Sequence, residues 1–322
     1  GDCKDKAPLF IVALKQLGIT AFPVILNSAG DVQRSAPSIA QLDHVIAAFK
    51  RPGKTQYEFA DLTASLTPLG ELPFDYQGSF GMVVHPDGSI EEITFPKAPM
   101  ADNFGARRIA GALSVDGQFT GTYEESGTGS RQYSLRNAFE NPLDSAQRAK
   151  AANAIAGNIF EGAKGDSLTG FAGKDLSVNP KMSVIVRDGR AASMAGTSVI
   201  LTNPFGTMSG FSSAAQEIET AGPRLFPIDA AKIFGYGVTS MEFRVTLPDG
   251  WHAQLPSNVD ASSEFGKYHS EYAQSGRDLV IKRTITGAGG DYAPDQLKTM
   301  LDWMRKIATD DAKLIVIEKG AR

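Results

Sequence analysis

Residues 44–62, HVIAAFKRPGKTQYEFADL, contain two short runs with the composition of β-strands. His44–Phe49 and Tyr57–Leu62 are rich in β-branched and aromatic residues, and the turn-forming sequence Arg51-Pro52-Gly53-Lys54 lies between them. The pattern predicts a β-hairpin. A loop of four residues is favoured over a tighter turn, because Pro-Gly does not suit the two-residue turns that hairpins prefer.

The predicted hairpin brings a histidine opposite an aspartate. If the hairpin is symmetric about its turn, Ile46 lies opposite Phe59 and His44 lies opposite Asp61. Side chains alternate between the two faces of a strand, so these four share one sheet face and the polar pair ends an apolar stripe. A loop with an odd number of residues would shift this register.

The segment before the hairpin has the pattern of a helix. Residues 3–17, CKDKAPLFIVALKQL, carry apolar side chains at the spacing of an amphipathic helix, and Gly18 follows as a typical C-terminal residue. The apolar positions are Ala7, Phe10, Ile11 and Leu14, and we expect this stripe to pack on the sheet face that carries Ile46 and Phe59. Pro8 leaves two possibilities: the helix begins near Cys3 and bends at Pro8, or regular helix starts only near Asp5.

Beyond about residue 80, short strand-like runs alternate with turn signals. The turn pairs are Asp87-Gly88, Asp116-Gly117, Asp188-Gly189, Asp249-Gly250 and Ser275-Gly276. Two helices are expected in this part, at Asp144–Phe160 and Pro294–Ala308, and a final strand at Leu314–Ile317. The proline-rich segment Phe95–Pro99 is a predicted domain boundary.

The sequence therefore predicts an α+β protein of two domains. Residues 1–95 are expected to form a helix and an antiparallel sheet beginning with a strand at Ile19–Leu26. Residues 96–322 are expected to form a mostly antiparallel, β-sandwich-like region with two helices, as one domain or two subdomains.

Composition excludes several classes of function. The 322 residues carry a net charge of -4 and no Lys/Arg block, so no nucleic-acid partner is expected. The longest apolar run, Ala7–Leu14, is too short to span a membrane. The single cysteine rules out an internal disulfide, and His85, His252 and His269 lack partners at metal-ligand spacing. No metal or cofactor is expected.

One set of residues has the chemistry of nucleophilic catalysis: Cys3 at the head of a helix, His44 and Asp61. A thiolate is the reactive form of cysteine, and a helix N-terminus with a neighbouring imidazole favours it. In this interpretation His44 exchanges a proton with Cys3, and Asp61 fixes the orientation of the imidazole. The residues also fit a structural interpretation, in which Cys3 is a small buried side chain and His44 and Asp61 are a cross-strand pair.

The same segments resemble a known family. Gly1-Asp2-Cys3-Lys4-Asp5-Lys6-Ala7, then Asp43-His44-Val45, then Phe59-Ala60-Asp61-Leu62-Thr63 are similar in order and spacing to the core of bacterial transglutaminase-like proteins of the papain-like superfamily. The resemblance is specific over residues 1–80 and diffuse beyond them. It implies a catalytic triad of Cys3, His44 and Asp61, thioester chemistry on peptide or glutamine amides, a peptide or protein substrate and an extracytoplasmic location.

The resemblance also leads to two expectations about the chain as a whole. The family carries helices, part of a substrate groove and an oxyanion-hole donor before its cysteine, where this chain has only Gly1 and Asp2. We therefore expect the sequence to be part of a longer parent enzyme and to be inactive alone. The alternative function is an inactive binding or structural module that uses residues 96–322 to bind peptide or envelope polymers. The oligomeric state cannot be inferred from the sequence.

Overall fold

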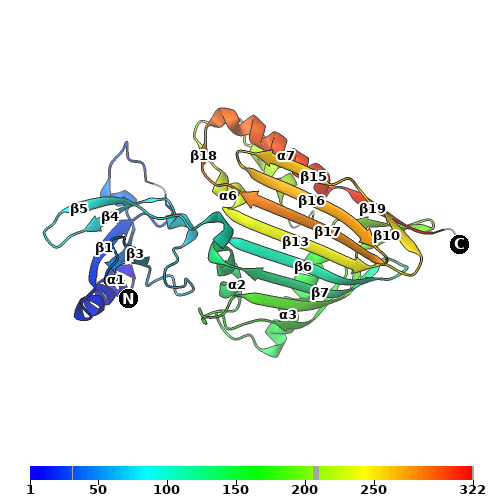
Figure 1. Cartoon of the computed structure of the whole chain (residues 1–322), viewed down its shortest axis with the longest axis horizontal. Helices are drawn as coiled ribbons and strands as arrows, with labels where there is room; N and C mark the ends of the chain where they lie inside the picture. The colour runs from blue at the N-terminus through cyan, green and yellow to red at the C-terminus, as the bar shows by residue number, and fades with distance from the viewer. Residues whose placement is uncertain (31, 206–209, 321–322) are drawn as a thin grey trace. The chain divides into compact units, whose positions relative to one another are not determined.

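The structure is a computed structural model that describes residues 1–30, 32–205 and 210–320. The chain divides into two compact units. Three segments make up the first unit: Gly1–Pro99, Arg136–Glu140 and Ala172–Asn179. The second unit contains Met100–Leu135, Asn141–Phe171 and the chain from Pro180 onward. The fold is α+β with mostly antiparallel sheets, which confirms the predicted class (Figure 1).

The first unit contains an antiparallel sheet of five strands in the order β3-β2-β1-β4-β5. The strands are β1 Thr20–Leu26, β2 His44–Lys50, β3 Glu58–Ala60, β4 Phe80–Val84 and β5 Ile90–Thr94. The predicted strand before the hairpin is β1, and it lies in the middle of the sheet. The hairpin prediction is confirmed, since β2 and β3 pair antiparallel.

Helix α1 (Cys3–Gln16) begins at Cys3 and includes Pro8, which is the first of the two predicted possibilities. The Asp2 carboxylate accepts a hydrogen bond from the Lys4 amide at 2.9 Å, and the Asp5 carboxylate accepts one from the Asp2 amide at 3.2 Å. This reciprocal cap satisfies backbone donors that the first turn leaves free. The cap explains how a helix with an internal proline begins at the cysteine.

The register of the hairpin differs from the prediction. Ala48, not Ile46, lies opposite Phe59, because the last pair before the turn is Phe49–Glu58 and the loop it encloses is longer than the four predicted residues. The pairing has moved by two residues, so the predicted direct opposition of His44 and Asp61 is wrong. A shift of two keeps every side chain on its predicted face, because side chains alternate with a period of two.

The predicted packing of α1 is also wrong. We expected its apolar stripe to cover Ile46 and Phe59, but Ile11 and Leu14 pack with Ala47 and Phe49 on the opposite face of β2. The face that carries Ile46 and Phe59 is covered by residues that follow β3. These are Leu72, Tyr76 and Phe95. The sheet of the first unit therefore has a hydrophobic layer on each side.

The second unit is built on a sheet of eight strands in the order β15-β16-β17-β13-β6-β7-β9-β8. The pairing of β13 with β6 is parallel, and all the others in this sheet are antiparallel. The strands are β6 Phe104–Leu113, β7 Gln118–Gly127, β8 Lys164–Thr169, β9 Lys181–Arg190, β13 Gly237–Thr246, β15 Val259–Ser263, β16 Gly266–Ser275 and β17 Asp278–Gly287.

Two smaller antiparallel sheets complete the strands described in this unit. A sheet of four has the order β10-β11-β19-β14, and β12 pairs with β18. Their strands are β10 Ala192–Ala195, β11 Ser198–Thr202, β14 Trp251–Gln254, β19 Leu314–Lys319, β12 Ile228–Asp229 and β18 Asp291–Tyr292. The predicted final strand, at Leu314–Ile317, is therefore confirmed as β19.

The two predicted helices of the second half are confirmed as α3 (Ser145–Ile159) and α7 (Leu297–Asp311). The described residues of this half also contain three shorter helices that the sequence analysis did not predict. They are α2 Tyr133–Ala138, α5 Phe211–Thr220 and α6 Ala230–Phe234. No helix in the described part of the chain combines the length and apolarity needed to cross a membrane.

Most turn signals lie where the sequence predicts them. Asp116-Gly117 connects β6 to β7, and Ser275-Gly276 lies at the tip between β16 and β17. Asp188-Gly189 is an exception, because both residues belong to β9. The register of β9 against β7 shifts here, and Asp188 has a positive φ of 56°. The Asp-Gly pair at this position forms a β-bulge instead of a turn.

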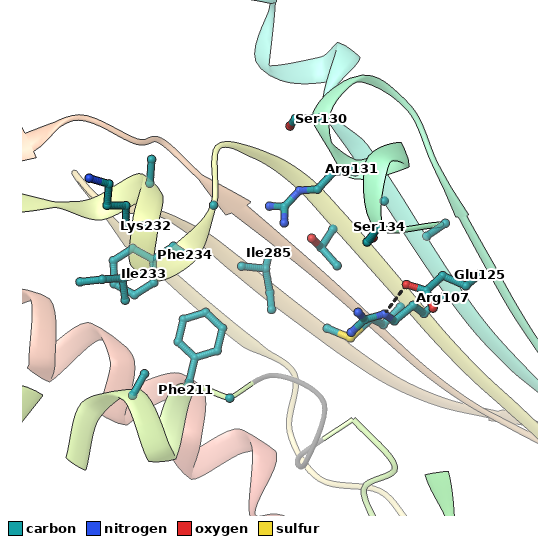
Figure 2. A pocket seen from close by; sticks show the side chains of 18 of the residues that line it. Arg107, Glu125, Ser130, Arg131, Ser134, Phe211, Lys232, Ile233, Phe234 and Ile285 are labelled. Atoms are coloured by element: carbon teal, nitrogen blue, oxygen red, sulfur yellow. Dashed lines mark hydrogen bonds and ion pairs between the residues drawn. The ribbon is translucent and has the colours of Figure 1, made fainter. Parts of the chain in front are cut away.

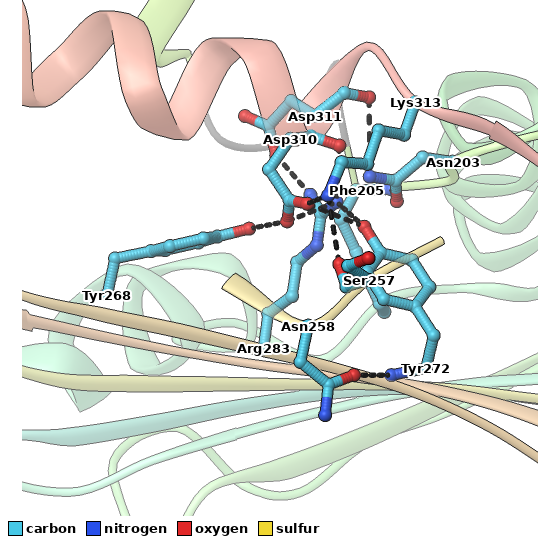
Figure 3. A network of polar contacts seen from close by, with 10 residues as sticks. All are labelled: Asn203, Phe205, Ser257, Asn258, Tyr268, Tyr272, Arg283, Asp310, Asp311 and Lys313. Atoms are coloured by element: carbon cyan, nitrogen blue, oxygen red, sulfur yellow. Dashed lines mark hydrogen bonds and ion pairs between the residues drawn. The ribbon is translucent and has the colours of Figure 1, made fainter. Parts of the chain in front are cut away.

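A buried polar network joins α7 to the large sheet (Figure 3). The side chains of Arg283 on β17 and Asp310 on α7 are fully buried, with Nη2 and Oδ2 3.3 Å apart. The Asp310 carboxylate also accepts hydrogen bonds from Tyr268, from Tyr272 at 3.0 Å and from Lys313 at 2.8 Å. Four donors on one carboxylate offset the cost of burying its charge.

We predict that Asp310→Asn destabilises the second unit by about 3 kcal/mol, because it removes the buried negative charge that accepts hydrogen bonds from Tyr268, Tyr272, Lys313 and Arg283, although Arg283 keeps its ion pair with Asp311. Both tryptophans, Trp251 and Trp303, lie in this unit, so tryptophan fluorescence during urea unfolding reports its stability. Asp302→Asn is the matched control in the same helix. It breaks an exposed pair with Lys298 and should cost less than about 1 kcal/mol. Equal losses in the two variants would contradict the prediction.

Candidate active site

His44 and Asp61 form a buried hydrogen-bonded pair in the first unit. His44 is the first residue of β2, and Asp61 directly follows β3. His44 Nε2 donates to Asp61 Oδ2 at 2.9 Å, and the side chains are 11% and 2% exposed. The structure therefore brings together two of the three predicted site residues, although they are not directly opposed in the sheet.

The Asp61 carboxylate has two further partners. Tyr76, in the short 3₁₀ helix η2 (Phe74–Tyr76), donates its hydroxyl to Oδ2 at 3.0 Å. Thr63 donates its amide at 2.8 Å and its hydroxyl at 2.6 Å to Oδ1. Four hydrogen bonds hold the carboxylate in one orientation, which in turn fixes the imidazole plane.

Sequence reasoning did not assign a role to either of these partners. Tyr76 lies in an irregular segment without periodic pattern, so no sequence signal points to it. Its ring centroid lies 5.8 Å from that of His44, which adds a contact to the imidazole. Thr63 could have been found, because Asp-x-Thr is the pattern in which a carboxylate bonds the backbone two residues on.

The two charges stabilise each other. The hydrogen bond with Asp61 raises the pKa of His44 to about 9, although burial of the imidazole acts in the opposite direction. Burial disfavours the charged form of Asp61, but the hydrogen bonds from His44 and Thr63 outweigh it and lower the pKa of this carboxyl to about 2. An imidazolium and a carboxylate are therefore the resting forms at neutral pH.

Cys3 lies at the head of α1, partly exposed. The nearby Cys3 side chain is a further cause of the raised pKa of His44, so thiol and imidazole are neighbours. Because Asp61 occupies Nε2, Nδ1 is the ring nitrogen that remains for the sulfur. The structure thus associates all three predicted residues, one from each of three separate segments.

Asp43, next to the histidine, has a different role. Its carboxylate accepts hydrogen bonds from the Ser28 amide at 2.7 Å and the Ser28 hydroxyl at 2.8 Å. The bonds from Ser28 lower the pKa of Asp43. Asp43 therefore closes the long loop between β1 and β2 and holds the start of β2, where His44 lies.

Comparisons with known proteins give two findings. Residues 232–317, in the second unit, match the model of DUF3858, a domain of unknown function with solved structures. A crystal structure described as that of a putative protease from Parabacteroides distasonis ATCC 8503 is similar at 15% identity, with a TM-score of 0.41. The match covers 97% of this chain and 42% of that one, so this chain spans less than half of that protein. No curated protein matches the sequence.

The described residues contain no group of three or more His, Cys, Asp or Glu side chains arranged to hold a metal ion.

We predict that the His44 imidazole titrates near pH 9 in NMR spectra, and that Asp61→Asn lowers its pKa to about 6.5 or below, because the variant keeps burial but removes the anion. Asp260→Asn is the control. It alters the exposed His269–Asp260 pair, whose Nδ1 and Oδ1 lie 2.7 Å apart, and should leave His44 unchanged. A His44 that titrates near 6.5 in the unaltered protein would contradict the prediction.

The same shifts set the pH range in which this pair stabilises the first unit. The His44 contribution is complete below about pH 6.5 and is lost as the pH rises through about 9. The Asp61 contribution is complete above about pH 4 and is lost as the pH falls through about 2. Both contributions are complete between about pH 4 and pH 6.5. Hydrogen exchange of the β2 amides, relative to intrinsic rates, should therefore be slowest in this range.

Proposed function

We propose that Cys3, His44 and Asp61 are the catalytic triad of a transglutaminase-like cysteine enzyme that transfers acyl groups from peptide or glutamine amides. The observation that carries this proposal is the buried His44–Asp61 ion pair beside the only thiol of the chain. A pair with a purely structural role would need no thiol beside the imidazole. The resemblance of the three segments to the transglutaminase-like core supports the same assignment.

The resting charges suggest how the first half of the reaction runs. The Cys3 thiolate attacks the amide carbonyl carbon, and the imidazolium of His44 delivers its Nδ1 proton to the departing nitrogen. The C–N bond breaks, the amine or ammonia leaves, and the acyl group remains on sulfur as a thioester. Asp61 keeps Nε2 protonated and the ring in position throughout.

The second half of the reaction resolves the thioester. Neutral His44 removes a proton from water or from a primary amine, the resulting nucleophile attacks the thioester carbonyl, and the thiolate leaves. Water gives hydrolysis, the reaction of a peptidase or amidase. An amine gives a new amide bond, the reaction of a transglutaminase. Both outcomes use the same three residues, and the choice depends on which nucleophile reaches the acyl group.

We predict that a glutamine-containing peptidyl chloromethyl ketone alkylates Cys3 at pH 7, and that His44→Ala slows this reaction on the order of tenfold or more, because the imidazolium no longer stabilises the thiolate. Since Cys3 is the only cysteine, the mass increase of the intact protein measures its reaction alone. Asp61→Asn should slow alkylation as well, because it removes the charge that keeps the imidazole protonated.

His85→Ala is the matched control. His85 also belongs to the first unit and contacts a carboxylate, with Nε2 3.3 Å from Glu91 Oε2, but it has no link to Cys3. Its variant should react at the rate of the unaltered protein, and Cys3→Ser should not react. Equal rates for the unaltered protein and His44→Ala would show that the pair is structural.

A further inference from the structure

A cavity of about 560 Å³ lies in the second unit, on one face of the large sheet (Figure 2). Its floor is formed by three neighbouring strands. Arg107 on β6 pairs with Met241 on β13, and Thr239 on β13 pairs with Ile285 on β17. Its walls come from α5, α6 and the 3₁₀ helix η4 (Gly129–Gln132). This volume is typical of a site for a small molecule.

Arg131, on η4, directs its guanidinium group into this cavity (Figure 2). Its Nε is buried without a hydrogen-bond partner, and the described residues supply no ion pair to the guanidinium. Burial, and then the charge of Arg107, lower the pKa of Arg131. A partly buried cation without a counter-charge is costly, so an anionic group of a bound ligand would stabilise it.

The other cations at the cavity are already paired. Arg107 donates through Nε to Glu125 at 3.2 Å. Lys232 Nζ lies 3.8 Å from the Asp229 carboxylate. Arg131 is therefore the source of a single excess positive charge among the described residues that line the cavity.

The chain leaves space for this guanidinium. Gly235 follows α6 with φ of 72°, and a Cβ atom built on it would lie 2.4 Å from Arg131 Nη2. Any other residue at this position would push the guanidinium out of place. Gly235 thus leaves room for the Arg131 guanidinium, which is the only unpaired charge among the described residues that line the cavity.

The opposite side of the cavity is apolar and well fixed. Phe211 on α5 and Phe234 on α6 stack with ring centroids 5.8 Å apart, and both contact the edge or face of Trp303. Ile285 and Met304 extend this surface. A ligand that fits both sides carries an anionic group at one end and an apolar group at the other.

We propose that this cavity binds a small monocarboxylate, whose carboxylate accepts hydrogen bonds from Arg131 and whose apolar chain or ring lies against Phe211, Phe234 and Ile285. The planar guanidinium matches a carboxylate in a two-point geometry. One excess charge favours a monoanion over a phosphate dianion. The site is independent of Cys3, and nothing in this proposal rests on the acyl-transfer reaction.

Calorimetric titration of the full chain with octanoate, octanamide and octyl phosphate tests the proposal. We expect octanoate to bind at least about tenfold more tightly than octanamide, since hydrogen bonds to a charged group contribute that much. Arg131→Gln should remove this preference and leave octanamide binding unchanged, which also shows that the variant is folded. Arg131→Lys keeps the charge without the two-point geometry and should bind octanoate with intermediate affinity.

Arg108→Gln is the matched control, because Arg108 lies on the other face of β6, half exposed and close to Glu124 and Glu242. It should bind octanoate like the unaltered protein. Absence of octanoate binding at millimolar concentration, or equal affinity for octanoate and octanamide, would overturn the proposal. Octyl phosphate binding more than about tenfold tighter than octanoate would overturn the assignment to a monocarboxylate. If Arg131→Gln does not fold, the test rests on the octanoate affinity of Arg131→Lys and on the ratio of octanoate to octanamide affinity in the unaltered protein.

Discussion

The parallel pairing of β6 with β13 is the constraint on which the second unit depends. Val238–Thr246 pairs in register with Phe104–Ala112, and this seam joins two antiparallel halves into one sheet. The floor of the cavity lies on the seam. The strand next to it, β17, carries Arg283 and so positions the buried network under α7. A slip of one residue along this seam would turn Arg107 and Met241 to the opposite face and remove the cavity floor.

Asp61, Asp310 and Arg131 are three charged groups in buried or partly buried positions, and they differ in how far the described residues satisfy them. Asp61 and Asp310 each accept four hydrogen bonds, so the chain itself offsets the cost of burying these carboxylates. Asp310 holds a helix against a sheet. Asp61 stabilises a cation whose second nitrogen is left for a thiol. Arg131 has no such offset within the described residues, and this difference separates a structural charge from one suited to a ligand.

Local patterns were enough to predict α1, the hairpin, α3, α7 and the association of His44 with Asp61, because these depend on spacing within a few residues. The predicted register of the β2–β3 hairpin was wrong, since the length of the connecting loop sets the register and the loop sequence has no pattern that gives its length. The prediction of the sheet face that α1 covers was wrong, because Leu72, Tyr76 and Phe95 cover that face instead. These three residues lie outside regular strands and long helices, so no periodic pattern predicts their packing. The β6–β13 seam joins segments more than a hundred residues apart, and no local signal encodes such a pairing. Arg131 could not be identified from the sequence, because only the structure shows that its buried Nε has no hydrogen-bond partner.

The first unit is discontinuous along the chain, which limits how the molecule can be divided. The backbone passes from one unit to the other after residues 99, 135, 140, 171 and 179. A single proteolytic cut after residue 99 separates the sheet of the first unit from the two later segments of that unit, which stay attached to the second unit. A gene fragment that ends at residue 99 encodes only one of the three segments of its unit. Recombination therefore cannot exchange the thiol-bearing unit as one cassette, and its sheet and its later segments have to be inherited together.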